Sequence, residues 1–201
     1  MHIKKEYKTR KKKIQRRLKE FAKIGHKKNP DELFLELCYC LCTPLSKAEK
    51  VYKIINKENK EKLKLYNPSD LSSFLKGNCR FHNNKAKYIC QSRNHMPLIM
   101  HLPKDPINSR DLLAKNIKGL GYKEASHFLR NIGYRKVAIL DSHILTTLHS
   151  LRVLKSNKRP KSKREYLEME NKMKQFADKI KIDMDELDLL FWSMRTGIVL
   201  K

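Results

Sequence analysis

"KGLGYKEASHFLRNIG", from Lys118 to Gly133, is the stretch that decides the fold of this chain. Two glycines two residues apart, Gly119 and Gly121, stand directly before a pattern of apolar residues at helical spacing. A hairpin this tight between two helices requires a positive φ or a close backbone approach at the glycines, which a Cβ atom would hinder. The following helix would present its first backbone amides beyond the hairpin, where an anion can bind them. Lys118 and Lys123 add positive charge there, so the stretch predicts a phosphate-binding helix–hairpin–helix.

The charge of the whole chain points in the same direction. Its 201 residues include 46 Lys and Arg against 21 Asp and Glu, which gives a formal net charge of +25. An excess of this size indicates a polyanionic partner, and nucleic acid is the usual one. Two plainer interpretations stay open, because thermophile surfaces can be rich in lysine and glycine corners also join helices that bind nothing.

The composition excludes several other classes of protein. A hydrophobic content of 40% suits one globular unit or two small lobes and is too high for a disordered tail. No stretch reaches the eighteen apolar residues of a membrane span, and the basic N-terminus lacks the apolar core of a signal peptide. We therefore expect an intracellular protein without a membrane partner.

The five cysteines predict neither a disulfide framework nor a metal site. Their number is odd, and Cys38, Cys40 and Cys42 alternate along one short apolar stretch. On a helix, side chains two residues apart point about 200° apart, so these three thiols cannot all face one ion. Buried free thiols are the interpretation that we prefer.

Helical patterns with their own start and stop signals follow one another along the chain. Residues 7–24 form the first, and the second runs from the cap at Asn29 to the stop at Thr43-Pro44. Ser46 and Glu49 are spaced as a capping box for the third. Further helices are expected around 68–76, 83–95, 109–116, 122–132, 142–153, 163–181 and 184–196. The alternating pattern of half-buried strands is missing, so the sequence predicts an all-α fold. The basic run at residues 155–164 is a loop, either a solvated linker or a second phosphate contact.

The segment "IKGLGYKEASHFL" resembles the helix-hairpin-helix of the DNA glycosylase superfamily that includes endonuclease III and the 8-oxoguanine DNA glycosylases. In the bifunctional members of that superfamily, the lysine at the position of Lys123 is the nucleophile. The superfamily also has an aspartate at the start of a later helix, and "AILDSHIL" supplies Asp141 eighteen residues after Lys123. This pair is far more specific than the hairpin alone.

Within the superfamily, the chain most resembles the archaeal-type, second class of 8-oxoguanine DNA glycosylase/AP lyases. The small size, the segment "CRFHNNKAKYI" and the ending "MRTGIVLK" carry this resemblance, which spans most of residues 30–201. One departure is Lys118, because many relatives have proline there. The sequence has no cysteine after Cys90, which argues against the C-terminal iron–sulfur cluster of endonuclease III.

The resemblance implies an all-α, two-lobed helix-hairpin-helix DNA glycosylase fold with the active-site cleft between the lobes. Residues 1–28 would pack with the C-terminal lobe, residues 29–136 would form the lobe with the hairpin, and residues 137–201 would form the C-terminal lobe. We expect a monomer in the cytoplasm of an archaeon or a bacterium.

The implied activity is DNA repair on double-stranded DNA that contains 8-oxoguanine or abasic sites. Lys123 would form a Schiff base after base loss and cut the strand by β-elimination, while Asp141 would stabilise the charge on the sugar. The resemblance suggests Phe81, Trp192 and Lys201 for base recognition, and Gly119, Gly121, Lys118 and His143 for the DNA backbone. No cofactor is required, although a Na⁺ or K⁺ ion could bind the backbone carbonyls of Lys115, Ile117 and Leu120.

Two other functions fit the same residues. A glycosylase for oxidised pyrimidines would share Lys123 and Asp141, and a non-catalytic helix-hairpin-helix protein would use the hairpin for phosphates alone. Individual residues also have plainer roles: Asp141 as a helix cap, Trp192 in core packing and Lys201 at a frayed terminus.

Overall fold

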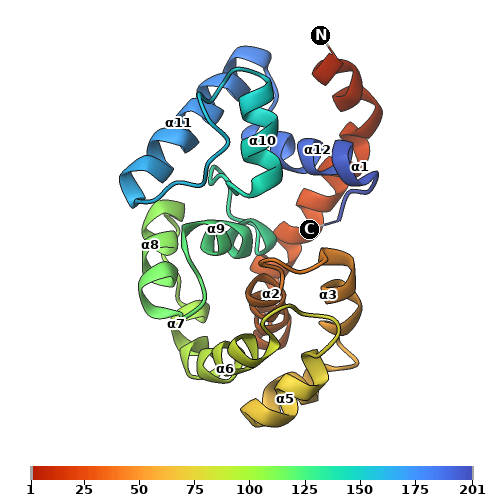
Figure 1. Ribbon diagram of the computed structural model, residues 1–201, viewed down its shortest axis with the longest axis vertical. Coiled ribbons are helices and arrows are strands. Elements are labelled where there is room, and N and C mark those ends of the chain that lie inside the picture. The colour runs from red at the N-terminus through yellow and green to blue at the C-terminus, as the bar shows by residue number, and fades with distance from the viewer. Residues whose placement is uncertain (1, 201) are drawn as a thin grey trace. The chain divides into compact units, whose positions relative to one another are not determined.

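The computed structural model describes residues 2–200, which form helices joined by turns and loops (Figure 1). The elements are α1 (His2–Lys27), α2 (Pro30–Cys42), α3 (Ala48–Ile54), α4 (Lys60–Leu65), α5 (Pro68–Leu75), α6 (His82–Ser92), η1 (Arg93–His95), α7 (Met96–Met100), α8 (Pro106–Asn116), α9 (Tyr122–Asn131), α10 (Ser142–Ser150), α11 (Lys163–Ile180) and α12 (Met184–Thr196). Residues 2–200 contain no strand, so the all-α prediction is confirmed. The short helices α4 and α7 were not predicted from the sequence, because each has fewer than two turns in which a periodic pattern could show.

The predicted capping box before the third helix is wrong. α3 begins at Ala48, and its N-cap residue, Lys47, makes no side-chain capping bond. Ser46 Oγ instead accepts the backbone N–H of Arg80 at 2.9 Å and the ammonium of Lys85 at 2.8 Å. The hydroxyl therefore joins the loop before α3 to the start of α6 and does not start a helix.

The chain divides into two compact units. Unit 1 combines the residues up to Lys23 with those from Leu129 onward, and unit 2 comprises residues 24–128. The division falls inside α9, whereas the expected boundary was at residue 136. Residues 129–136 lie with unit 1 because they pack on α1: the Arg130 guanidinium lies over the Phe21 ring at 5.0 Å.

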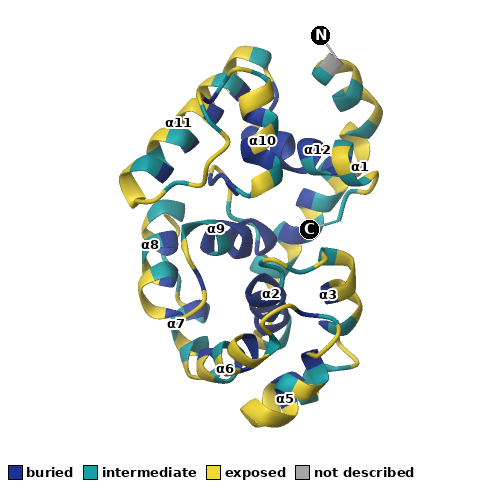
Figure 2. Ribbon diagram, viewed as in Figure 1, coloured by how far each residue is buried: buried dark blue, intermediate teal, exposed yellow. Residues whose placement is uncertain are grey.

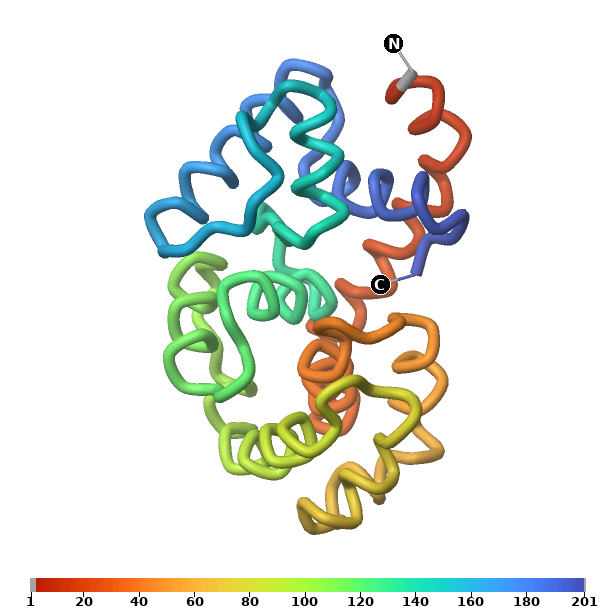
Figure 3. The backbone as a smooth tube through the Cα atoms, viewed as in Figure 1, coloured from red at the N-terminus to blue at the C-terminus, as the bar shows by residue number. Residues whose placement is uncertain are grey.

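Unit 1 brings the first and the last helices of the chain together (Figure 3). Ile14 and Phe21 on α1 are fully buried, and Tyr7 and Gln15 donate hydrogen bonds to Glu186 of α12. α12 also packs against α10 and α11. Residues far apart in the sequence thus form one core, and a buried pair, Arg130 and Asp188, lies 3.7 Å apart within it.

Gly133 lies close to the backbone of α1 and leads to a stability prediction. Its φ is +91°, and a Cβ built there would lie 2.8 Å from Ala22 Cα and 3.3 Å from Phe21 O. We expect Gly133→Ala to destabilise the protein by more than about 2 kcal/mol, since a left-handed alanine already costs about 1–2 kcal/mol before the backbone clash. Thermal unfolding of Gly77→Ala is the control, because Gly77 has a φ of +79° and no atom within 4 Å of its Cβ position. Equal losses in the two variants would contradict this account.

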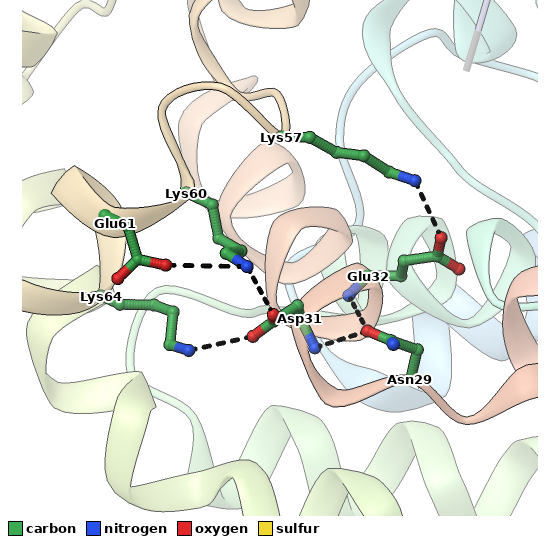
Figure 4. Close-up of polar contacts among 7 residues, drawn as sticks. All are labelled: Asn29, Asp31, Glu32, Lys57, Lys60, Glu61 and Lys64. Atoms are coloured by element: carbon green, nitrogen blue, oxygen red, sulfur yellow. Dashed lines mark hydrogen bonds and ion pairs between the residues drawn. The ribbon is translucent and has the colours of Figure 1, made fainter.

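Unit 2 is built around α2, which is buried from Leu33 to Cys42 (Figure 2). Asn29 caps this helix by accepting the N–H groups of Asp31 and Glu32, as predicted from the sequence (Figure 4). Lys60 and Lys64 of α4 bind the Asp31 carboxylate at 2.7 and 3.0 Å, and these hydrogen bonds lower its pKa. The start of α2 is therefore tied to α4. α6 and α7 pack on the same helix.

All five cysteines are free, and Cys38, Cys40, Cys42 and Cys79 are buried, so the prediction of buried thiols is confirmed. Across residues 2–200, no group of three or more His, Cys, Asp or Glu side chains could hold a metal ion. No helix in this part of the chain is both long and apolar enough to cross a membrane.

Candidate active site

The hairpin between α8 and α9 has the predicted glycine geometry at Gly119, whereas the prediction for Gly121 is wrong. Gly119 has a φ of +95°, and a Cβ there would lie 2.5 Å from Tyr88 Cδ2 and 3.0 Å from Leu41 Cδ2. Both the backbone angle and the space therefore require glycine. At Gly121 the φ is not left-handed, and a Cβ would meet only the flexible end of Glu124 at 3.2 Å.

Hydrogen bonds fix where the helix after the hairpin begins. Leu120 N donates to Ile117 O at 3.1 Å and closes the turn, while Gly121 O accepts from Ala125 N at 2.9 Å. The Ala125 amide is thus the first donor within α9, and the amides of residues 122–124 come before it. An anion at this end of α9 would meet them directly, with the exposed Lys118 beside it.

Lys123 lies in the first turn of α9 and is partly exposed. Its side chain retains 23% of its accessible surface, and its Nζ lies 3.7 Å from Glu124 Oε1. Later positions of the helix are completely buried and fix the orientation of α9; these are Ala125, Phe128 and Leu129. Lys123 is thus an accessible amine on a rigid support.

A second lysine, Lys85 of α6, is buried and was not singled out from the sequence. Its Nζ donates to Cys42 O at 2.6 Å, to Pro44 O at 2.7 Å and to Ser46 Oγ at 2.8 Å. These three acceptors match the three protons of an ammonium, so the residue holds the loop after α2 against α6. No acidic neighbour or motif spacing in the sequence marks it.

Lys85 also has an electrostatic relation to Lys123. Burial lowers the pKa of the Lys85 ammonium, and the positive charge of Lys123 lowers it further, while the thiols of Cys42 and Cys79 act in the opposite direction. The positive charge of the candidate nucleophile thus acts on a buried amine of the same unit.

Asp141 is the N-cap residue of α10, as the plainer interpretation proposed. Its Oδ1 accepts the N–H groups of His143 and Ile144, both at 2.8 Å. The residue is only half-buried. The cap fixes the carboxylate at the start of the helix and leaves Oδ2 for another partner, so a structural and a chemical role are compatible.

The other predicted residues of unit 1 lie on α10, on α12 and at the end of the chain. His143 is half-buried in the first turn of α10, next to the Asp141 cap. Trp192 on α12 is also half-buried, whereas its neighbour Phe191 is 2% exposed, so the indole is not simply part of the core. Lys201 lies outside the described residues.

Phe81 has the most unusual backbone among the predicted residues. It is 53% exposed and has a left-handed backbone (φ 57°, ψ 36°) at the N-cap of α6. The Arg80 guanidinium lies over its ring at 5.2 Å, and the Ser46 hydroxyl holds the Arg80 amide. An exposed aromatic ring in a strained conformation is typical of a ligand-contacting residue.

A pocket of about 340 Å³ opens between the loop before α3 and the loop before α6. Residues 45–47, Lys50 and residues 77–80 line it. Leu45 at its edge is 57% exposed and also has a positive φ, of 56°. Neither Leu45 nor Arg80 was selected from the sequence, because strain and exposure leave no pattern in it.

Comparison with known proteins identifies the family of the chain. The family model described as "8-oxoguanine DNA glycosylase" matches residues 14–182. The chain belongs to the 8-oxoguanine DNA glycosylase family. The resemblance found in the sequence is therefore confirmed.

Relatives of this glycosylase occur in bacteria and archaea. An 8-oxoguanine DNA glycosylase/AP lyase of Fusobacterium nucleatum is 40% identical over 99% of this chain and 96% of its own length. One of Methanocaldococcus jannaschii is 38% identical over 94% of this chain and 91% of its own.

Solved structures of the family share the fold of this glycosylase. The 8-oxoguanine glycosylase/lyase of M. jannaschii, in complex with a 15mer DNA containing 8-oxoguanine, superimposes with a TM-score of 0.91 at 36% identity. That alignment covers 100% of both chains. The 8-oxoguanine DNA glycosylase of Thermotoga maritima gives a TM-score of 0.93 at 30% identity, over 100% of this chain and 97% of the other.

Proposed function

We propose that this protein is a bifunctional DNA repair enzyme that excises 8-oxoguanine from double-stranded DNA and cleaves the strand at the resulting abasic site. The observation that carries the proposal is Lys123, an accessible amine in the first turn of α9, directly after the Gly119 hairpin. Among the three functions that the sequence left open, membership of the 8-oxoguanine DNA glycosylase family selects this one.

Binding begins at the DNA backbone in this proposal. The amides at the start of α9 and the ammonium of Lys118 would hold a phosphate at the hairpin, whose turn requires glycine at Gly119. His143 would contact a further phosphate from α10. The damaged nucleotide then leaves the base stack, at a cost of a few kcal/mol, so that its C1′ atom becomes accessible.

Lys123 acts as a nucleophile on C1′. Its neutral amine forms the N–C1′ bond as the bond between C1′ and the base breaks, and the base leaves with the bonding electrons. Ring opening gives a Schiff base between Nζ and C1′. Loss of a C2′ proton then expels the 3′ phosphate, which is β-elimination, and water releases the lysine.

Asp141 assists the same nucleotide without forming a bond to it. A carboxylate near the sugar stabilises the positive charge that develops as the base departs, and it can accept the proton that Lys123 releases. The α10 cap keeps the carboxylate in a fixed orientation, so little reorganisation is needed during the reaction.

Base recognition would involve stacking and one hydrogen bond. Phe81 and Trp192 are the aromatic side chains proposed to hold the flipped base, since stacking contributes about 1–3 kcal/mol per base. The C-terminal carboxylate of Lys201 is the proposed acceptor for N7–H, which 8-oxoguanine has and guanine lacks.

Deleting Lys201 should therefore slow the excision of 8-oxoguanine by at least about tenfold, since one charge-assisted hydrogen bond contributes about 1.5–3 kcal/mol. Cleavage of a ready-made abasic site should stay near the parent rate, because no base remains to be recognised. Single-turnover rates on the two substrates test this, with Lys201→Ala as the control that keeps the terminal carboxylate at the same position. Equal losses of rate on both substrates would show that Lys201 does not recognise the base.

No cofactor is required for this chemistry, but a monovalent cation fits the hairpin. Lys115 lies in the last turn of α8, and Ile117 and Leu120 follow in the hairpin. Ile117 O accepts one hydrogen bond and keeps a second lone pair. A Na⁺ or K⁺ ion held by these three carbonyls would stiffen the hairpin. Because its partner is DNA, we expect the enzyme to act in the cytoplasm.

The decisive experiment uses three duplexes that differ in one base: 8-oxoguanine, an oxidised pyrimidine or normal guanine. With borohydride present, the proposed function predicts that a covalent protein–DNA adduct forms with the 8-oxoguanine duplex far faster than with the other two duplexes. A preference for the oxidised pyrimidine would mean that this base, and not 8-oxoguanine, is the substrate. Binding without any adduct would mean that the protein does not form the Schiff base.

A further inference from the structure

α1 is amphipathic in an unusual way. Its buried face contains Ile14, Leu18 and Phe21. The opposite face carries the α1 basic stripe, which we define as Lys5, Lys8, Lys12, Arg16, Lys19 and Lys23. At 100° per residue these six positions fall within an arc of about 80°. All six are exposed, and Figure 2 shows exposed positions recurring along α1.

The α1 basic stripe is scarcely neutralised by the protein itself. The helix has two acidic residues, Glu6 and Glu20. Glu6 pairs with Arg10, outside the stripe, and Glu20 binds Arg17 at 2.7 Å and Arg16 at 3.1 Å. The five lysines of the stripe have no carboxylate within ion-pair distance anywhere in residues 2–200.

This arrangement opposes the stability of the helix. Like charges four residues apart repel, and the stripe contains three such pairs: Lys8 with Lys12, Lys12 with Arg16, and Lys19 with Lys23. The first turn has no acidic residue, although acids are favoured at a helix N-terminus. A partner with dense negative charge would relieve this repulsion.

α11 is another surface helix, but its exposed face does not carry charges of a single sign. α11 belongs to the same unit and is also amphipathic, with Tyr166, Met173 and Ala177 buried. Its exposed face mixes signs: Glu168 lies 3.6 Å from Arg164, and Asp178 is also exposed. The single sign of the stripe is thus a property of α1.

We propose that the α1 basic stripe binds the phosphate backbone of duplex DNA as a second contact surface, separate from the hairpin and without a role in chemistry. The stripe spans about 27 Å at 1.5 Å per residue, which corresponds to about eight base pairs at 3.4 Å each. Lysines on a helix present point charges that suit phosphates and read no base. This inference rests on the proposed function only in taking duplex DNA as the polyanion.

The test compares two triple variants with equal charge loss. Lys8→Gln, Lys12→Gln and Lys19→Gln together interrupt every like-charge pair of the stripe. The matched control carries Lys172→Gln, Lys174→Gln and Lys179→Gln on α11, where all three lysines are exposed. Fluorescence anisotropy with an undamaged duplex, at salt concentrations from about 50 to 200 mM, gives the affinity and its salt dependence.

The stripe variant should bind at least about tenfold more weakly at low salt, and the slope of log affinity against log salt should fall by about 2–3, close to one per lost phosphate contact. The α11 control should keep the parent slope. Without DNA, the stripe variant should unfold at a higher temperature than the parent, because the repulsion along α1 is gone; this also excludes misfolding as the reason for weaker binding.

Two outcomes would overturn the inference. Equal losses of slope in both variants would mean that only net charge matters, and an unchanged affinity of the stripe variant would mean that α1 does not contact DNA. Single-turnover excision of 8-oxoguanine is measured separately on the unaltered protein. A protein that binds through the stripe but excises nothing would therefore contradict the proposed function and not this inference.

Discussion

Replacing Lys123 by glutamine should abolish both the borohydride-trapped adduct and strand cleavage, with a loss of at least about four orders of magnitude in rate. The reason is chemical, because glutamine has no amine that can form a bond to C1′. Its length and polarity keep the first turn of α9, whose orientation depends on the buried residues after it. Affinity for an 8-oxoguanine duplex should stay within a few-fold of the parent. Trapping and gel-based cleavage assays, together with a binding isotherm, measure the three quantities.

Lys118→Gln is the matched control for Lys123→Gln. Both lysines lie at the hairpin, but Lys118 is exposed on its outer side and is proposed only to contact phosphate. The control should bind more weakly, with a salt slope lower by about one, and should still form the adduct at saturating enzyme. If Lys123→Gln cleaves at the parent rate, or if Lys118→Gln is the variant that loses the adduct, the nucleophile has been assigned to the wrong residue.

Replacing Asp141 by asparagine should lower the rate of 8-oxoguanine excision by about 10²–10³, the range measured when one preorganised electrostatic group is removed from an active site. Asparagine keeps an oxygen at the position of Oδ1, so the hydrogen bonds from His143 and Ile144 survive. As an N-cap it is about as good as aspartate. The thermal unfolding temperature should therefore hardly change while the rate falls.

Asp105→Asn is the control for Asp141→Asn, because Asp105 caps α8 in the same way through a 2.7 Å bond from Asn108 N. It should leave both stability and excision near the parent values. Asp141→Ala adds the loss of the cap and should cost about 1 kcal/mol of stability as well. Full excision activity in Asp141→Asn would show that the residue is a helix cap and nothing more.

Local signals predicted much of the fold from the sequence. The Asn29 cap, the Asp141 cap and the Gly119 turn depend on residues within a few positions of one another, and each occurs as expected. The predicted capping box at Ser46 does not form, because residues far away in the sequence bind its hydroxyl. A tertiary partner, Lys85, together with the Arg80 amide, takes the hydroxyl that a local rule assigned to the helix.

The residues of the candidate site also fall into two groups: those that the sequence could indicate and those that it could not. Lys123 and Asp141 could be selected because a motif fixes their spacing in the chain. The buried cation Lys85 could not, since its three acceptors lie about forty residues earlier and include two backbone carbonyls, which carry no side-chain signature. The exposure and the left-handed backbone of Phe81 and Leu45 likewise follow from how two loops meet.

By itself, the sequence determined the helical class, the hairpin with its lysine, the family resemblance and the polyanionic partner, because periodicity, glycine geometry and charge are properties of neighbouring residues. Only the tertiary structure decided that residues 129–136 join the N-terminal helix, where Gly133 packs against Ala22. The tertiary structure also shows that the six residues of the α1 basic stripe are exposed while Ile14 and Phe21 are buried. Packing between distant segments decides which side chains are covered, and no local pattern records it.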